Sequence, residues 1–302
     1  MKFRSKNLLV TGGAGFIGSN FIDYILKIHK SLKVYNLDLL TYAGNLENTN
    51  PFKNNPNYLF IKGDISDTAL VESLFDKYEI DGVINFAAES HVDNSIVNPK
   101  VFIKTNINGV FNLLNISHKK WMRSNFNPKN KFKHSRFHQV STDEVYGSII
   151  EGTFCENYPY KPNSPYSASK ASADMLVRSF NKTYGLNTTI TISSNNYGKN
   201  QHKEKFIPTI IHCLMNKKSI PVYGDGLNVR DWINVIDHCE AIVKVFNNSK
   251  SGETYNVGAN NEISNLELID ILYNDLKKTH KIEKKIKFVK DRLGHDRRYS
   301  LD

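Results

Sequence analysis

The sequence predicts an α/β fold, with a doubly wound parallel sheet and a smaller C-terminal lobe. In the first two-thirds of the chain, short runs rich in β-branched residues alternate with segments of helical period, an order typical of βαβ units. A glycine-rich turn joins the first run to the first helical segment, as in sheets that bind ligands at their carboxyl edge. The expected strands are 7–10, 34–37, 59–61, 83–86, 137–140 and 188–192.

The alternation weakens after residue 192. Turns rich in Gly, Asn and Pro follow, interrupted by a helix near 207–215. We therefore expect residues 1–192 to form the sheet domain and residues 193–302 to form mainly a second lobe, with segments near 229–258 returning to the sheet domain. A chain of 302 residues with 40% hydrophobic content can bury a core of this size.

The composition excludes several classes of protein. The longest apolar runs are too short to cross a membrane, and the one after the basic start ends in glycines too early for a signal peptide, so we expect a cytoplasmic protein. The three cysteines, Cys155, Cys213 and Cys239, lack the spacing of a disulfide framework or a metal site, and no metal is expected. The net charge of +10 suits a polyanionic ligand or nucleic acid. Much of it falls in 277–298, on an expected helix, strand and loop, where a solvated basic face is the simpler explanation.

The glycine-rich turn is Thr-Gly-Gly-Ala-Gly-Phe-Ile-Gly at 11–18. Gly13, Gly15 and Gly18 match the pattern G-x-G-x-x-G, and Gly12, Gly15 and Gly18 match the variant G-x-x-G-x-x-G. After a strand and before a helix, this pattern is the dinucleotide fingerprint of a Rossmann-type domain, because the backbone can approach a pyrophosphate at the helix N-terminus. Glycine turns also join strands to helices without binding a ligand, so the motif alone is moderate evidence.

Asp38, about 20 residues after the last glycine, supports the dinucleotide interpretation. A carboxylate there accepts hydrogen bonds from the adenosine ribose and repels a 2′-phosphate, which favours NAD over NADP. A turn aspartate is the alternative. Asp64, after the third strand, can face the adenine, and Ala87-Ala-Glu-Ser90, after the fourth, falls near the expected nicotinamide.

Tyr166 and Lys170 lie four residues apart, so on a helix they occupy one face. A nearby ammonium stabilises phenolate, and we expect it to lower the pKa of Tyr166 toward that of a general base. A Tyr-x-x-x-Lys pattern arises easily by chance on an amphipathic helix. Its place after a dinucleotide fingerprint makes it far more specific.

Thr142 follows the strand 137–140, at the sheet edge that faces bound ligands, and Asp143 and Glu144 come next. Eliminating water requires a base for a carbon acid and an acid for the departing hydroxyl, and two carboxyl groups in different surroundings can divide these roles. The alternative, that the acids cap the next helix or lie in a solvated turn, has similar weight on these residues alone.

Together these motifs closely resemble those of the dTDP-glucose 4,6-dehydratases, a family of extended short-chain dehydrogenases/reductases. The Thr-Asp-Glu string at 142–144 is the most diagnostic, because it separates the family from UDP-galactose epimerases. The resemblance covers nearly the whole chain, through the segments 11–18, 39–45, 87–93, 141–147, 164–170, 194–198, 229–232 and 291–299.

The resemblance implies a redox-neutral cycle on a nucleoside-diphosphate glucose with tightly held NAD. Tyr166, assisted by Thr142 and Lys170, deprotonates the 4-hydroxyl while NAD takes the C4 hydride. Glu144 then removes the C5 proton, Asp143 protonates the leaving 6-hydroxyl, and hydride returns to C6. The product is the 4-keto-6-deoxy sugar nucleotide.

The resemblance also assigns binding residues. For NAD they are Gly12, Gly13, Gly15, Phe16, Ile17, Gly18, Asp38, Asp64, Ile65, Ala87, Ala88, Ser90, Thr105, Tyr166 and Lys170. For the sugar nucleotide they are Ser90, His91, Thr142, Asn195, Asn196, Lys205, Pro221, Tyr223, Arg230, Asn265, Arg292 and His295. Surface salt bridging is the alternative for the two arginines.

Three features depart from the family pattern. Asn94 stands where the dTDP enzymes usually have arginine, and the related UDP-glucose 4,6-dehydratases share this asparagine. Leu293 replaces a usual proline, and the chain stops at Asp302 where family members continue, so the nucleotide lobe is expected to lack an edge element. A UDP-glucose 4,6-dehydratase is therefore the nearest alternative. A sugar-nucleotide epimerase or decarboxylase, or a non-catalytic relative that binds NAD or nucleic acid, is further away.

The family likeness implies a homodimer in which the helix carrying Tyr166 and Lys170 and the helix near 101–114 pack against their symmetry mates. Apolar positions recur at helical spacing on both, although a monomer core would show the same pattern. These positions are Val110, Leu113, Leu114, Ala173, Leu176 and Val177.

Overall fold

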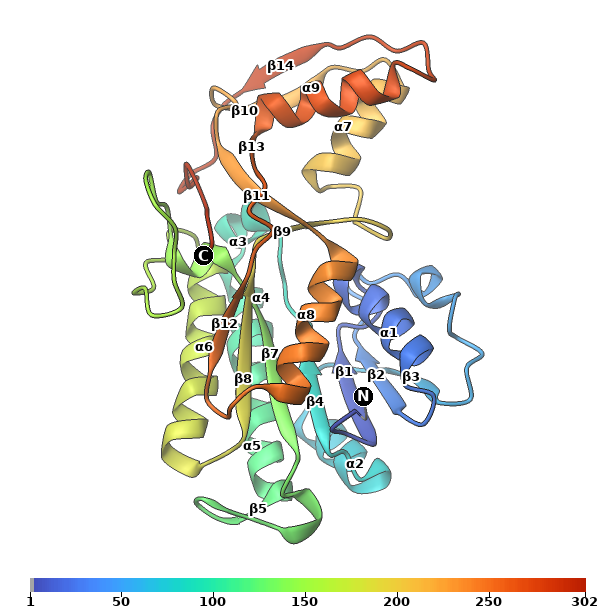
Figure 1. Ribbon diagram of the computed structural model, residues 1–302, viewed down its shortest axis with the longest axis vertical. Coiled ribbons are helices and arrows are strands. Elements are labelled where there is room, and N and C mark those ends of the chain that lie inside the picture. The colour runs from blue at the N-terminus through green and yellow to red at the C-terminus, as the bar shows by residue number, and fades with distance from the viewer. Residues whose placement is uncertain (1–2) are drawn as a thin grey trace.

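The structure is a computed structural model that describes residues 3–302, in two lobes (Figure 1). The larger lobe contains a seven-stranded sheet in the order β12-β8-β7-β4-β1-β2-β3. Every neighbouring pair is parallel, which confirms the predicted doubly wound sheet. The strands are β1 (Asn7–Thr11), β2 (Lys33–Asp38), β3 (Tyr58–Lys62), β4 (Gly82–Asn85), β7 (Arg136–Thr142), β8 (Thr188–Ser193) and β12 (Thr254–Val257).

Helices cover both faces of this sheet because successive residues of a parallel strand point to opposite sides. On β1, Leu9 enters one apolar core, while Leu8 and Val10 enter the other. The first core packs against α2 (Thr68–Tyr78), α5 (Val110–Trp121) and α6 (Pro165–Tyr184). The second packs against α1 (Phe16–Ile28) and α8 (Val235–Asn248). Thus α8 and β12 join the large lobe.

Helix α6 has strong start and stop signals. Ser164 caps its N-terminus in a reciprocal arrangement with Ser167, and Pro165 occupies the first turn. Gly185 ends it with a φ of +72°, a left-handed conformation that glycine adopts at little cost. These signals place Tyr166 in the first turn, close to the carboxyl edge of the sheet.

The single helix expected over 101–114 is interrupted. The chain forms α4 (Pro99–Phe102), a π-helical segment η2 (Ile103–Gly109) and then α5. Within η2, the Asn106 side chain hydrogen-bonds both the N–H and the C=O of Glu89, which fixes the segment to the loop after β4. A π-helical turn of this kind has no signal in residue periodicity.

The smaller lobe is built on a parallel pair, β10 (Ile220–Tyr223) and β14 (Ile286–Val289), against which α7 (Phe206–Met215) and α9 (Asn265–Leu276) pack. Three strands, β9 (Asn195–Tyr197), β11 (Val229–Asn234) and β13 (Glu262–Ser264), lie between the lobes (Figure 1). Because α9 ends at Leu276, the basic segment 277–298 carries β14 but not the expected helix. The remaining elements are η1 (Leu46–Thr49), α3 (Val92–Val97), β5 (Met122–Ser124), β6 (Asn127–Pro128), η3 (Asn130–Phe132) and η4 (Asp143–Tyr146).

Candidate active site

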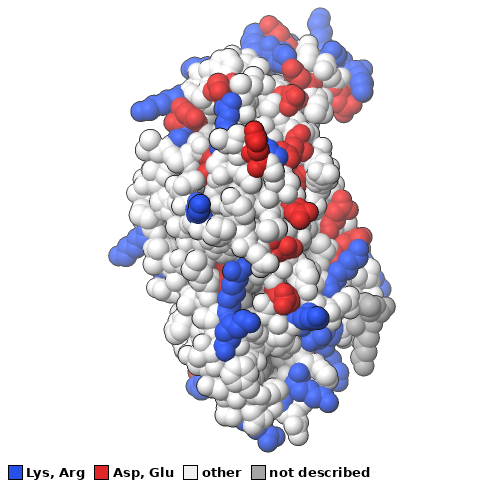
Figure 2. Space-filling model, turned by 60° about the vertical axis from the view of Figure 1, so that its left-hand side comes forward, with Lys and Arg blue, Asp and Glu red and all other residues white. Residues whose placement is uncertain are grey.

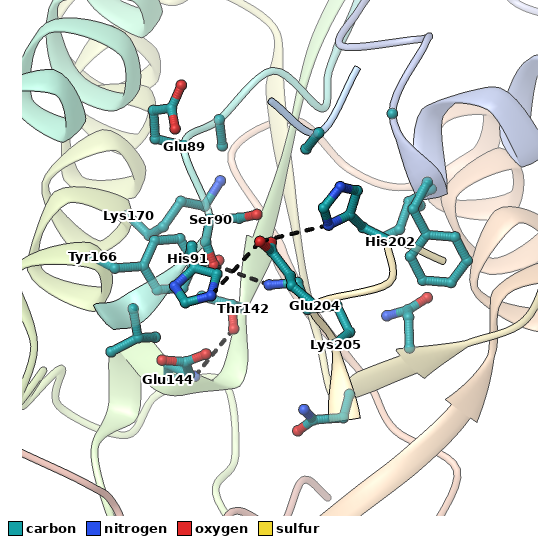
Figure 3. A pocket seen from close by; sticks show the side chains of 18 of the residues that line it. Glu89, Ser90, His91, Thr142, Glu144, Tyr166, Lys170, His202, Glu204 and Lys205 are labelled. Carbon is teal, nitrogen blue, oxygen red and sulfur yellow. Dashed lines mark hydrogen bonds and ion pairs between the residues drawn. The ribbon is translucent and has the colours of Figure 1, made fainter. Parts of the chain in front are cut away.

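A cavity of about 910 Å³ lies between the lobes, at the carboxyl ends of the central strands. Figure 3 shows Tyr166, Lys170, Thr142 and Glu144 on one side, with His202, Glu204 and Lys205 approaching from the other. The residues predicted for NAD and for the sugar nucleotide all line this one cavity, except Gly13.

Gly13, which is predicted to contact the cofactor, does not line the cavity. Its N–H donates to Oδ1 of Asn36 at 3.0 Å, so the residue serves the join between β2 and the glycine turn. Gly12 and Gly18 do line the cavity. A Cβ on Gly12 would lie 2.6 Å from the backbone nitrogen of Ala87, and one on Gly18 would lie 2.4 Å from the carbonyl oxygen of Gly12.

The N-terminus of α1 opens into the cavity without a side-chain cap, because its N-cap residue is Gly15. Its first N–H groups are therefore available to an anion, as a pyrophosphate site requires. Asp38 lies next to this turn, its Oδ2 accepting from the N–H of Ala14 and its Oδ1 from Leu40, both at 2.8 Å. Burial raises the pKa of Asp38, and these hydrogen bonds oppose the effect. The groove fits a dinucleotide with an unphosphorylated ribose.

Asp64 lines the cavity with its carboxylate already engaged. Its Oδ2 pairs with Nζ of Lys104 at 2.8 Å, and its Oδ1 accepts from the N–H of Ser66 at 2.8 Å. These contacts orient the side chain. Ile65 and Thr105 line the same cavity.

Tyr166 and Lys170 lie one turn apart on α6, and both are buried. Lys170 Nζ donates to the carbonyl oxygen of Val140 at 2.7 Å. Burial lowers the pKa of Lys170, while Asp174, one turn further along, raises it. The expected lowering of the Tyr166 pKa is wrong for the protein by itself. Burial and the nearby Glu144 raise it well above its usual value, and a hydrogen bond with Thr142 opposes them only in part.

Asp143 and Glu144 occupy the first turn of η4, directly after β7. The alternative that they belong to a capped turn is true in part, since Thr142 Oγ1 caps η4 by accepting from the N–H of Glu144 at 3.4 Å. Both nevertheless line the cavity. Burial and Glu144 raise the pKa of Asp143 well above its usual value.

Glu144 differs from Asp143 in its surroundings. Burial raises its pKa, but the positive charges of Arg230, Lys205 and Arg292 oppose this effect. The two neighbouring carboxyls are therefore in different environments. Asp143 is held more firmly in the protonated form, and Glu144 faces cations that favour its charged form.

The smaller lobe supplies these cations. Nζ of Lys205 donates to the carbonyl oxygen of Ser90 at 3.2 Å. The guanidinium of Arg230 donates to the carbonyl oxygens of Val229 at 2.7 Å and Asp296 at 2.9 Å, and it lies 4.3 Å from the ring centre of Tyr299. These hydrogen bonds fix the guanidinium of Arg230 at the wall of the cavity.

Arg292, unlike Arg230, forms a salt bridge, which is the alternative given for both arginines in the sequence analysis. Its Nε and Nη2 donate to the two carboxylate oxygens of Asp93 at 2.6 and 2.9 Å. Asn196, a further predicted contact, accepts from buried His238 through Oδ1 at 2.8 Å. The other predicted contacts of this lobe, Asn195, Pro221, Tyr223, Asn265 and His295, line the cavity.

Sequence reasoning missed several cavity residues, among them His202 and Glu204. Glu204 Oε2 lies 3.7 Å from Nε2 of His91 and 3.5 Å from Nδ1 of His202. Glu204 comes directly before Lys205, a predicted substrate contact, and this neighbouring position is a signal that could have found it. His202 lies in an irregular loop and has no signal in the sequence. Among residues 3–302, no group of three His, Cys, Asp or Glu side chains could hold a metal ion.

A doubly wound sheet, an uncapped glycine turn and a buried Tyr-x-x-x-Lys pair facing one cavity define the class of short-chain dehydrogenases/reductases. The chain matches the family model described as GDP-mannose 4,6 dehydratase over residues 9–302. It is 48% identical over 301 residues to the dTDP-glucose 4,6-dehydratase of Xanthomonas campestris pv. campestris. The aligned region covers 97% of this chain and 84% of that protein.

Two solved structures agree. The dTDP-glucose 4,6-dehydratase of Streptomyces venezuelae, solved with NAD and TYD bound, superposes with a TM-score of 0.88 at 42% identity, covering 98% of this chain and 88% of that one. The enzyme of Bacillus anthracis, solved in complex with NAD, has a TM-score of 0.85 at 44% identity, covering 98% and 87%. The chain belongs to the GDP-mannose 4,6 dehydratase family, and the predicted resemblance to its dTDP-glucose 4,6-dehydratases is confirmed.

Proposed function

We propose that this protein dehydrates dTDP-glucose to the 4-keto-6-deoxy sugar nucleotide with NAD as a bound cofactor. One observation carries the proposal most directly: the acid pair Asp143 and Glu144 lines the same cavity as Tyr166 and Lys170. An epimerase that works through the tyrosine alone needs no such pair. The names of the similar enzymes support dTDP-glucose as the substrate.

The glycine turn and Asp38 would hold NAD, with the pyrophosphate at the N-terminus of α1 and the adenosine ribose at Asp38. When bound, NAD supplies a hydride acceptor at C4 of the sugar and a hydride donor at C6. Titration of NAD into cofactor-stripped protein tests this binding without the reaction.

In this proposal Tyr166 takes the proton of the 4-hydroxyl as its phenolate, a form that the positive charge of bound NAD would favour. Burial and the negative charges of Glu144 and Asp143 raise the pKa of Tyr166. When Asp143 is protonated it carries no charge, so one of the causes that oppose ionisation of Tyr166 is removed. Thr142 offers a hydroxyl beside the phenol. The ammonium group of Lys170, one turn further along α6, is held in place by its hydrogen bond to the carbonyl oxygen of Val140. The first proton transfer thus depends on the state of the acid pair.

The elimination step divides between the two acids. Glu144, facing Arg230 and Lys205, takes the C5 proton, which the new ketone at C4 makes acidic, and gives a proton back to C5 when hydride reaches C6. Asp143, held protonated by burial, gives its proton to the departing 6-hydroxyl. Arg230 and Lys205 would hold the diphosphate through charge-assisted hydrogen bonds to its oxygens.

The nearest competing function uses the same chemistry on UDP-glucose. Separate incubation of the purified protein with dTDP-glucose and UDP-glucose, with mass analysis of the products, tests both. We expect a product lighter by one water from dTDP-glucose at the higher kcat/KM. A product of unchanged mass from either substrate would point to epimerisation and overturn the proposal.

We further propose a homodimer formed through α5 and α6. The apolar residues from which a dimer was predicted, such as Leu113 and Val177, lie in the monomer core and cannot form its interface. Phe111 on α5 and Met175 on α6 are 48% and 56% exposed, and the face formed by these helices is largely uncharged in Figure 2. A monomer in light scattering at micromolar concentration would remove this proposal.

A cytoplasmic location is also a proposal. All three cysteines are free thiols, as expected in a reducing compartment. No helix in the described part of the chain, residues 3–302, has the length and hydropathy to span a membrane. Cell fractionation of the tagged protein measures the location.

A further inference from the structure

Arg292 and Asp93 form an ion pair that joins the two lobes. Asp93 belongs to α3, which follows the cavity residues of the larger lobe, and Arg292 follows β14 of the smaller lobe. The Nε–Oδ1 distance is 2.6 Å and the Nη2–Oδ2 distance is 2.9 Å, so one edge of the guanidinium meets the whole carboxylate. This bidentate geometry fixes the plane of the guanidinium, which a single contact would leave free to rotate.

Tyr223 holds both members of the pair. Its hydroxyl lies 3.3 Å from Oδ2 of Asp93, and its ring centre lies 5.1 Å from Cζ of Arg292. Tyr223 ends β10, the partner strand of β14, so the pair is attached to the end of the small sheet that faces the cavity. His91 adds a weaker contact, with Nδ1 4.0 Å from Oδ2 of Asp93.

The pair uses only part of the guanidinium. Nη1 of Arg292 has no hydrogen bond to residues 3–302, although Arg292 lines the cavity. Asp93 itself does not line it. A carboxylate that holds one edge of an arginine from outside the cavity leaves the other edge for an anionic ligand inside it.

We propose that Asp93 is a positioning residue for the substrate's diphosphate: it holds Arg292 by the Nε–Nη2 edge, so that Nη1 remains available to a phosphate oxygen. This inference rests on the proposed function for the identity of the substrate. In the same proposal, the Asp93–Arg292 pair also holds α3 close to the end of β14. The opposite role, in which Asp93 competes with the phosphate for Arg292, predicts the opposite change in affinity.

The test compares wild type with Asp93→Asn, Arg292→Ala and the double variant. The control is Asp225→Asn, which removes a carboxylate from another arginine–aspartate pair outside the cavity, where Nη1 of Arg297 donates to both oxygens of Asp225 at 2.7 and 3.0 Å. The affinity for dTDP and for UDP is measured by calorimetry, together with KM, kcat and bound NAD. Thermal unfolding identifies any variant that fails to fold, and Asp93→Glu tests rescue.

We expect Asp93→Asn to weaken dTDP binding and raise KM by about tenfold, with kcat and NAD content little changed. The double variant should bind dTDP no more weakly than Arg292→Ala, because Asp93 acts through Arg292, and Asp93→Glu should recover part of the affinity. Unchanged or tighter dTDP binding in a folded Asp93→Asn protein would overturn the positioning role alone. If wild-type protein binds neither dTDP nor UDP, the proposed function fails together with it.

Discussion

Oγ1 of Thr142 donates a hydrogen bond to Oδ1 of Asp143 at 3.3 Å, while Oδ2 of Asp143 is buried without a hydrogen-bond partner in the described chain, residues 3–302. A buried carboxylate oxygen without a donor is costly, whereas a protonated carboxyl carries a hydrogen that it can give to a ligand. In the proposed reaction, this unpaired oxygen would carry the proton that Asp143 gives to the substrate's 6-hydroxyl.

Replacing Asp143 with Asn should stop the reaction after the oxidation step. The amide keeps the shape but cannot supply a proton, so kcat should fall by about 10²–10⁴-fold. Absorbance of NADH should rise on addition of dTDP-glucose while no dehydrated product forms. Normal product formation by this variant would show that Asp143 is structural.

The same substitution should stabilise the fold at neutral pH. The pKa of Asp143 is raised above its unfolded value of 3.8, so the folded state binds the proton more tightly and loses stability as pH rises above 3.8. The Asn variant does not lose this stability, because its amide has no proton to release in this pH range. Its Tm should exceed that of wild type at pH 7.5, and the difference should shrink as pH approaches 3.8. An equal Tm at both pH values would contradict the raised pKa.

Tyr166→Phe should lose at least about 10²-fold in turnover while keeping its bound NAD, because the proton acceptor is removed and the glycine turn is untouched. The amount of bound NAD is measured after its release from the protein with acid. Retention of more than a tenth of the wild-type rate would exclude Tyr166 as the base.

Arg230→Ala should raise KM for the sugar nucleotide by about tenfold with unchanged NAD content, since the guanidinium lines the cavity and is proposed to contact the diphosphate. Arg123→Ala, at an exposed position on β5, is the control. If the basic surface serves nucleic acid instead, KM should stay constant and a salt-dependent RNA or DNA affinity should weaken.

Much of the fold follows from local patterns. The apolar run of β1 and the start and stop signals of α6 are local properties, and they are enough to predict the first strand and the helix that carries Tyr166 and Lys170. The interruption of the helix after Phe102 is different. It depends on Asn106 reaching the backbone of Glu89, a tertiary contact that periodicity does not encode.

The site shows the same division. Motif spacing brought Thr142, Asp143 and Glu144 to the correct edge of the sheet, because parallel strands end there. Gly13 looked equivalent to its neighbouring glycines, and only the bond to Asn36 distinguishes it. Likewise, the sequence separates Asp93 from Arg292 by nearly the whole chain, so their pairing could be seen only in three dimensions.

The most direct test of the account follows one hydrogen atom. Purified protein is incubated with dTDP-glucose carrying deuterium at C4, and the product is examined by mass spectrometry and NMR. If hydride leaves C4 and returns to C6 within one cavity, the product will lack one water and carry the deuterium at C6. Deuterium found at C4, or lost to solvent, would contradict the proposed reaction.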